Sequence, residues 1–347
     1  LEDLNKRGVA QFVTNLMLQG TNDKSPIEFE KALDKLGASL SFYTASESFI
    51  LKGSCLVENF TQLMDLVEDV LLEPRWDEAE FNRLKTATLS GILQRQKSPD
   101  AVANLVFQRL LYGKDHIYGG SSLGTAKSVS SISLADLTLF YNQFLKSGQI
   151  QMNVVGNLSK SEVIRSVKKL AVKWPDIKVG LPAYKAPKKV AKTQLFIVDF
   201  PGTSQSIIRA GYLALPFTHP DFVPVKVANV MMGSFQGALN QILREEKGYT
   251  YGAYSRFSGG IQPGPFTVST KVETSTAAES IGIIKKQLSL YAENVKTEDF
   301  QYAKAFFGRS YPLKYESLGA LLTMVSRASK YGLDANYTLN EQQNVNN

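Results

Sequence analysis

The chain has 347 residues, of which 44% are hydrophobic and 20% charged, as expected for a globular protein and too apolar for a disordered one. Its length suggests about two domains, and it contains no run of 18 apolar residues that would predict a membrane span. The 39 Lys and Arg residues against 32 Asp and Glu give a mild net charge of +7. This excess favours a solvated basic surface over nucleic-acid binding.

The few cysteine and histidine residues restrict the possible metal chemistry. One cysteine, Cys55, excludes an internal disulfide and a zinc site built on cysteines. The two histidines, His116 and His219, stand far apart and outside any ligand spacing, so we interpret both as packing or loop residues. We therefore expect no catalytic zinc held by this chain alone.

The first half of the chain is predicted to be mainly helical. Apolar residues recur at helical spacing in the first element, at Val9, Phe12, Val13, Leu16 and Met17. Patterns of this kind, with their caps and breakers, predict helices over 8–20, 25–36, 58–73, 77–96, 101–111, 133–145 and 159–172. Runs rich in aromatic and β-branched residues predict strands over 39–45, 47–55 and 150–155.

A composition change divides the chain. Residues 180–192 hold two prolines and four lysines with little periodicity, so we predict domains over 1–180 and 194–347, joined by a linker over 181–193. Beyond it, strands are predicted over 194–200, 205–215, 249–258 and 265–272. Helices are predicted over 221–232, 236–247 and 275–291, and from 297 onward, before a polar tail over 340–347.

The order of elements occurs twice. In each half a helix ends at a glycine, Gly37 or Gly248. It is followed by a hairpin, a helix, and a second helix with acidic residues in its first turn. The two glycines are 211 residues apart, and the matching Phe81 and Phe300 are 219 apart, a difference that the longer second hairpin loop explains. We predict an α+β fold of two similar domains, each a mainly antiparallel sheet packed with helices.

Residues 8–21 read Gly-Val-Ala-Gln-Phe-Val-Thr-Asn-Leu-Met-Leu-Gln-Gly-Thr. This stretch resembles the opening helix of the M16 (pitrilysin/insulinase-like) zinc peptidases, Gly-[Leu/Ile]-Ala-His-Phe-Leu-Glu-His-Met-x-x-x-Gly-Thr. In that motif two histidines one turn apart hold zinc and a glutamate polarises the bound water. The matching positions here are Gln11, Asn15 and Thr14, which supply neither imidazole ligands nor a base.

The third ligand of the family is a glutamate 75–80 residues later, and the resemblance places Ser90 or Gly91 there. All three metal positions, Gln11, Asn15 and Gly91, are therefore degenerate, as is the base position Thr14. The resemblance covers roughly residues 8–310 and implies an M16 metallopeptidase-like fold without the zinc chemistry.

A second motif is intact. Residues 243–255 read Leu-Arg-Glu-Glu-Lys-Gly-Tyr-Thr-Tyr-Gly-Ala-Tyr-Ser, which resembles the second-domain signature of the same family. The resemblance maps its paired arginine and tyrosine onto Arg244 and Tyr251, which would bind substrate at a zinc site carried by another half. A guanidinium can donate to a peptide carbonyl, and a tyrosine hydroxyl can donate to a developing oxyanion. The structural alternative is an arginine that favours the helix dipole and a tyrosine that suits a strand.

The resemblance therefore implies the non-zinc half of a clamshell M16-like metalloendopeptidase that is inactive alone. Its expected partners are a zinc-bearing half, upstream in a longer polypeptide or in a separate subunit, and a peptide substrate. The chain begins Leu1-Glu2-Asp3 without Met or signal peptide, and we expect it to be cut from a longer polypeptide. The compartment stays open, with a lean to the bacterial periplasm that rests on the family.

Two other functions remain open from the sequence. The chain could be a catalytically inactive structural or peptide-binding subunit, for which the Arg244 and Tyr251 pair would have no chemical purpose. It could also be an independent metal enzyme, which predicts stoichiometric zinc in the purified protein. We expect none, because the ligand positions are degenerate.

Overall fold

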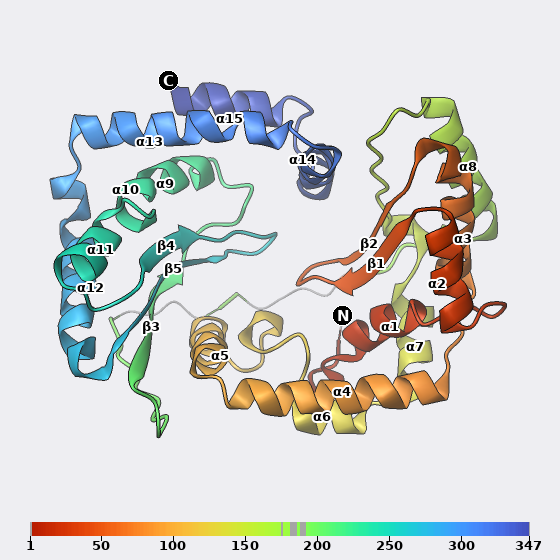
Figure 1. Cartoon of the computed structure of the whole chain (residues 1–347), viewed down its shortest axis with the longest axis horizontal. Helices are drawn as coiled ribbons and strands as arrows, with labels where there is room; N and C mark the ends of the chain where they lie inside the picture. Colours follow the sequence, from red (N-terminus) through yellow and green to blue (C-terminus); the bar gives the residue numbers. More distant parts are fainter. Residues whose placement is uncertain (1, 175, 181–185, 188–191, 347) are drawn as a thin grey trace. The chain divides into compact units, whose positions relative to one another are not determined.

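A computed structural model describes residues 2–174, 176–180, 186–187 and 192–346 (Figure 1). The chain forms two compact units, the first from Leu1–Ser98 and Tyr112–Pro187 and the second from Pro99–Leu111 and Lys188–Asn347. The chain therefore gives one helix to unit 2 before it returns to unit 1. Most of the linker predicted over 181–193 lies outside the described residues.

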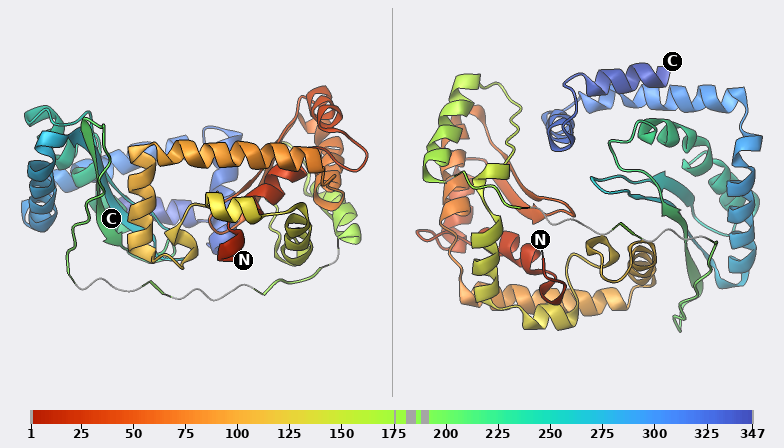
Figure 2. Two further views of the ribbon diagram at one scale, coloured as in Figure 1. Left: turned by 90° about the horizontal axis from the view of Figure 1, so that it is seen from below. Right: turned by 180° about the vertical axis from the view of Figure 1, so that it is seen from behind.

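Unit 1 is mainly helical and carries one antiparallel hairpin, β1 (Ser39–Thr44) with β2 (Phe49–Ser54). Its helices are α1 (Val9–Met17), α2 (Pro26–Lys35), α3 (Phe60–Leu72), α4 (Glu78–Gln96), α6 (Ala126–Ser131), α7 (Leu134–Phe144) and α8 (Lys160–Lys173). The views of Figure 2 show α4, in orange, as one long unbroken helix.

Helix α1 lies at the centre of this unit. The apolar residues that predicted it, including Phe12, Val13 and Met17, are buried and form the core with residues of α3, α4 and α7. Helix α2 begins at a capping box in which Ser25 and Glu28 satisfy each other's backbone amides, and Ser159 caps α8 in the same way. Local sequence and tertiary packing therefore agree here.

Unit 2 is built on a three-stranded antiparallel sheet in the order β3 (Gln205–Leu213), β5 (Pro265–Glu273), β4 (Ala253–Phe257). Its longer helices are α5 (Pro99–Tyr112, whose last residue belongs to unit 1), α12 (Ala277–Asn294), α13 (Thr297–Ser310), α14 (Leu318–Tyr331) and α15 (Tyr337–Asn346). Short helical segments lie between β3 and β4: α9 (Phe222–Ala228), α10 (Val230–Gly233), α11 (Ala238–Asn240) and a π-helical turn, η5 (Gln241–Glu246).

The two faces of this sheet differ in character. Alternate residues of β5, such as Phe266 and Val268, are buried against α10, α11, η5 and α12 (Figure 1). Ser269 and Lys271, further along the same strand, point to the opposite face, because successive strand residues alternate. That second face is polar and partly accessible, and the candidate site lies on it.

The repeat predicted from sequence is visible in both units. Gly37 and Gly248 both adopt left-handed backbone conformations, with φ of 53° and 67°, and each ends a helix before a hairpin. Hairpin β1–β2 is followed by α3 and α4, and hairpin β4–β5 by α12 and α13. The prediction of a mixed α+β fold with antiparallel sheets is confirmed.

Two predicted strands are wrong. The segments 150–155 and 194–200 belong to no strand among the described residues, and the side chains of Leu195 and Ile197 are largely exposed. Their composition suits a strand, but a strand also needs a hydrogen-bonding neighbour, which a local pattern cannot supply. The predicted helix over 236–247 is also wrong in detail, because only Ala238–Asn240 are α-helical and Gln241–Glu246 form the π-helical turn.

Three helices, α6, α14 and α15, were not predicted. The polar tail over 340–347 is mostly the helix α15, and its Val345 packs into a small core with Val227, Val230 and Ala303. Tertiary packing thus overrides a weak local pattern. No helix of the described residues is long and apolar enough to cross a membrane.

Candidate functional site

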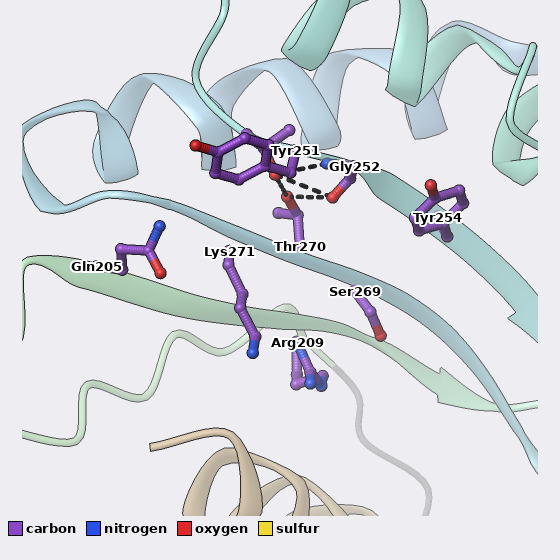
Figure 3. A pocket seen from close by; sticks show the side chains of 9 residues that line it. Gln205, Arg209, Tyr251, Gly252, Tyr254, Ser269, Thr270 and Lys271 are labelled. Carbon is purple, nitrogen blue, oxygen red and sulfur yellow. Dashed lines mark hydrogen bonds between the residues drawn. The ribbon is translucent and has the colours of Figure 1, made fainter. Parts of the chain in front are cut away.

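The accessible face of the unit 2 sheet carries a groove of about 320 Å³ (Figure 3). This volume is at the small end of the range for ligand sites in proteins. The lining residues come from β3, β5, the start of β4 and the loop before it: Gln205, Arg209, Thr250, Tyr251, Gly252, Tyr254, Ser269, Thr270 and Lys271.

Tyr251, predicted from the sequence, lines this groove. Its side chain is 92% exposed, while the backbone around it is held firmly. The hydroxyl of Thr270 lies 3.0 Å from the hydroxyl of Thr250 and 3.0 Å from the carbonyl oxygen of Gly252, and Thr250 also accepts from the Gly252 amide at 3.1 Å. These contacts, drawn in Figure 3, fix the residues on both sides of Tyr251 and leave its ring accessible.

Arg244, the second predicted residue, stands on the π-helical turn η5 and does not line the groove. Its guanidinium lies 4.9 Å from the centre of the Phe235 ring, and its Nε is 3.4 Å from a carboxylate oxygen of Glu245. Single π-helical turns occur often at functional sites. Gly248, in the left-handed conformation, then turns the chain toward Tyr251.

Asn240 is a positioning residue that sequence reasoning missed. Its fully buried amide donates from Nδ2 to the carbonyl oxygen of Phe235 at 2.8 Å, and its Oδ1 accepts from the amide of Ala253 at 3.2 Å. It thereby ties the segment that supports Arg244 to the strand that follows Tyr251. An isolated asparagine in a helical pattern carries no sequence signal for this role.

The two cations of the groove, Arg209 and Lys271, were also missed. Arg209 is only 11% exposed and donates to Asp100 at 2.5 Å, to Asn104 at 2.8 Å and to the carbonyl oxygen of Ile208 at 3.0 Å. These bonds anchor helix α5 to the sheet within unit 2. The two cations share a face through the strand register, in which Arg209 pairs with Ser269 and Ile207 with Lys271. A single sequence does not reveal that register.

The positions that would hold zinc lie in unit 1 and do not suit the metal. Gln11 donates from Nε2 to Oδ1 of Asn15 at 3.0 Å, so the two amides are hydrogen-bonded to each other. Thr14 is fully buried, with its hydroxyl 3.2 Å from the Gln11 carbonyl oxygen and 3.2 Å from the Thr44 hydroxyl. Gly91 offers no side chain, and a Cβ built there meets nothing within 4 Å.

These side chains offer zinc no imidazole, thiolate or carboxylate, which are the ligands it takes in proteins. Within the described residues, no group of three or more histidine, cysteine, aspartate or glutamate side chains could hold a metal ion. The residues present therefore do not fit a zinc ion.

Comparison with known families agrees with the geometry. The family model described as "Peptidase M16 inactive domain" matches residues 131–307, and "Insulinase (Peptidase family M16)" matches residues 1–115. The chain belongs to peptidase family M16, and its residues 131–307 match the inactive domain of that family. The resemblance drawn from the motifs at 8–21 and 243–255 is confirmed.

Two curated relatives match most of this chain, and one is named a zinc protease whereas the other is named a non-peptidase homolog. The "Uncharacterized zinc protease YmxG" of Bacillus subtilis is 24% identical over 307 residues, covering 83% of this chain and 73% of the relative. The "Non-peptidase homolog YmxG" of Helicobacter pylori is 24% identical over 351 residues, covering 97% of this chain and 78% of the relative.

Among solved structures, the peptidase M16 inactive domain from Pseudomonas fluorescens has a TM-score of 0.90 at 23% identity. The match covers 99% of this chain and 82% of that one. At this identity the likeness establishes the fold alone.

Proposed function

We propose that this chain is the non-zinc half of an M16 peptidase, and that it contributes Arg244 and Tyr251 to peptide substrate held by a zinc-bearing half. The zinc half would be a separate subunit or another part of a longer polypeptide. The emptied positions at Gln11, Asn15 and Gly91 and the match to the family's inactive domain support this division of labour.

The exposure of Tyr251 carries the proposal. Burying a large apolar side chain typically stabilises a protein by about 1.5–3 kcal/mol, and a ring that is 92% exposed contributes almost none of this. The backbone beside it is nonetheless fixed by the contacts of Thr250, Gly252 and Thr270. A rigidly mounted, accessible tyrosine suits recognition better than packing.

The chemistry available to this half is binding and electrostatic stabilisation. The Tyr251 hydroxyl can donate a hydrogen bond to an oxygen on which negative charge develops. The Arg244 guanidinium, supported by Phe235, can donate to a peptide carbonyl. Metal-bound chemistry would belong wholly to the partner half.

The test measures peptide hydrolysis by this chain assembled with a zinc-bearing M16 polypeptide from the same genome. We expect Tyr251→Phe and Arg244→Ala each to lower kcat by roughly 10²–10³-fold, the usual cost of removing one transition-state donor. Tyr212→Phe, an exposed tyrosine on β3 outside the groove, and Arg309→Ala, in the last turn of α13, are the matched controls.

Circular dichroism should show unchanged folding for Tyr251→Phe, because an exposed hydroxyl is all that is removed. Hydrolysis that stays at the wild-type rate in both Tyr251→Phe and Arg244→Ala would reject the proposal.

The second candidate function is a peptide-binding subunit without a part in turnover, which the degenerate zinc positions favour. That function predicts normal kcat together with weakened peptide binding.

A further inference from the structure

The groove around Tyr251 has an uneven charge. Among the described residues, its lining includes two cationic side chains, Arg209 and Lys271, and no carboxylate. The remaining lining residues are hydroxyl-bearing or neutral. An anionic group entering this groove therefore meets no like charge on its walls.

The two cationic side chains, Arg209 and Lys271, differ in their contacts. Arg209 uses its three guanidinium nitrogens to bind Asp100, Asn104 and the Ile208 carbonyl oxygen, so its charge is compensated and its position fixed. Lys271 is exposed, and among the described residues its side-chain ammonium makes no ion pair or hydrogen bond. Figure 3 shows its side chain between those of Gln205 and Arg209. The Lys271 ammonium is thus the charge available to a ligand.

The acidic residues near the groove leave this charge largely intact. Asp100 is occupied by Arg209. Glu273 is two residues beyond Lys271 on the same strand face and at the end of β5, but it does not line the groove. Arg256, also exposed, lies on this face opposite Thr267 and adds a further cation beside the groove.

The rest of the groove suits a peptide rather than a bare ion. The rings of Tyr251 and Tyr254 are 92% and 42% exposed and offer apolar surface with a hydroxyl at the edge. Exposed tyrosines of this kind are common in surfaces that bind peptide segments. A cation beside two accessible rings would recognise a carboxylate on a chain that carries apolar neighbours.

We propose that this groove selects peptide segments bearing an acidic side chain, which pairs with Lys271 while the flanking residues contact Tyr251 and Tyr254. The inference rests on the proposed function, because it assigns the substrate class of the same site. It adds a preference for charge to the peptide-carbonyl and oxyanion contacts proposed for Arg244 and Tyr251.

Fluorescence anisotropy of the full chain tests this, with three heptapeptides that carry a neutral dye and differ only in a central glutamate, glutamine or lysine. Exposed ion pairs are weak, so we expect the glutamate peptide to bind about 2- to 5-fold more tightly than the glutamine peptide at low salt. The difference should shrink in 0.5 M salt because the charges are screened. Lys271→Gln should abolish the difference, and Lys271→Glu should favour the lysine peptide.

Lys286→Gln, which removes another exposed cation on α12 outside the groove, is the control and should leave the preference intact. Equal binding of the glutamate and glutamine peptides to the wild-type chain would overturn the charge selectivity and leave the proposed function standing. A preference that survives in Lys271→Gln would also overturn it. Failure of all three peptides to bind would reject the groove as a peptide site altogether, whereas the proposed function is judged separately by kcat.

Discussion

Gln11 donates a hydrogen bond to Asn15 across 3.0 Å, one helical turn further along α1. In a zinc-binding helix of this family these two positions would both point at a metal. Here they are hydrogen-bonded to each other, and the hydroxyl of Thr14 between them is engaged with Thr44. The three positions therefore carry uncharged side chains that hydrogen-bond within the protein.

The first prediction concerns regain of zinc. The triple variant Gln11→His, Asn15→His, Gly91→Glu restores two imidazoles one turn apart and a carboxylate on α4, which contacts α1. Nothing lies within 4 Å of a Cβ at Gly91, so the new side chain meets no obstacle at its base. We expect about one zinc per chain by elemental analysis after dialysis, against none for the wild type.

Ser90→Glu in place of Gly91→Glu is the matched comparison, because the resemblance to the family motif places the missing ligand at one of these two positions. Zinc bound only by the version with Ser90→Glu would show that the third ligand position is residue 90 and not residue 91. Metal content at the wild-type level in both versions would show that the α1 face is not a vestigial zinc site.

The second prediction concerns the repeated glycines. Gly37 and Gly248 have positive φ values, and a Cβ at either would meet no atom within 4 Å. Substitution by alanine therefore costs conformational energy alone, and we expect each variant to lose about 1–2 kcal/mol of unfolding free energy in urea titrations.

Gly282→Ala is the control, because that glycine has equal space but lies within helix α12. There alanine should stabilise by about 0.5–1 kcal/mol. A loss at Gly282 as large as at the other two would mean that crowding, and not backbone conformation, sets the cost.

The third prediction is a pH dependence. His116 is buried in unit 1, its ring is stacked on Tyr112 at 5.2 Å, and its Nδ1 accepts from the Tyr118 amide at 3.1 Å. Burial, assisted by the positive charge of Arg7, lowers the pKa of His116 below its ordinary value of 6.5. In the pH range below 6.5, the unfolded chain therefore binds the proton more readily than the folded chain does.

The free energy of unfolding should consequently fall as the pH drops from 7.5 towards the folded-state pKa. His116→Asn keeps an acceptor for the Tyr118 amide but cannot titrate. It should be less stable than wild type at pH 7.5, and the gap should narrow by pH 5 in thermal or urea unfolding. A gap of constant size would exclude this histidine as a source of acid sensitivity.

Much of the architecture could be predicted because local signals were consistent. The apolar stripe of α1, the capping residues Ser25 and Ser159, and the glycines at the helix ends all specify structure within a few residues of themselves. The motif positions Arg244 and Tyr251 could likewise be named from the sequence, although their part in turnover stays a prediction.

The remaining features depend on contacts between distant residues. The strand patterns at 150–155 and 194–200 find no neighbouring strand among the described residues, and α15 is held by its Val345. Lys271 enters the groove only because of the register between β3 and β5, and Asn240 matters only because Phe235 and Ala253 come within its reach. Spacing along the chain contains none of this information.

Helix α5 belongs to unit 2, although the chain on both sides of it belongs to unit 1. A protein divided at the segment 181–193 would leave this helix on the N-terminal fragment, so the C-terminal fragment would carry Arg209 without Asp100 and Asn104. A C-terminal fragment expressed alone would therefore lack part of the support of its groove. The two halves of the sequence do not correspond to the two folded units. Fragment studies of this protein call for a synthetic α5 peptide added in trans to the C-terminal fragment.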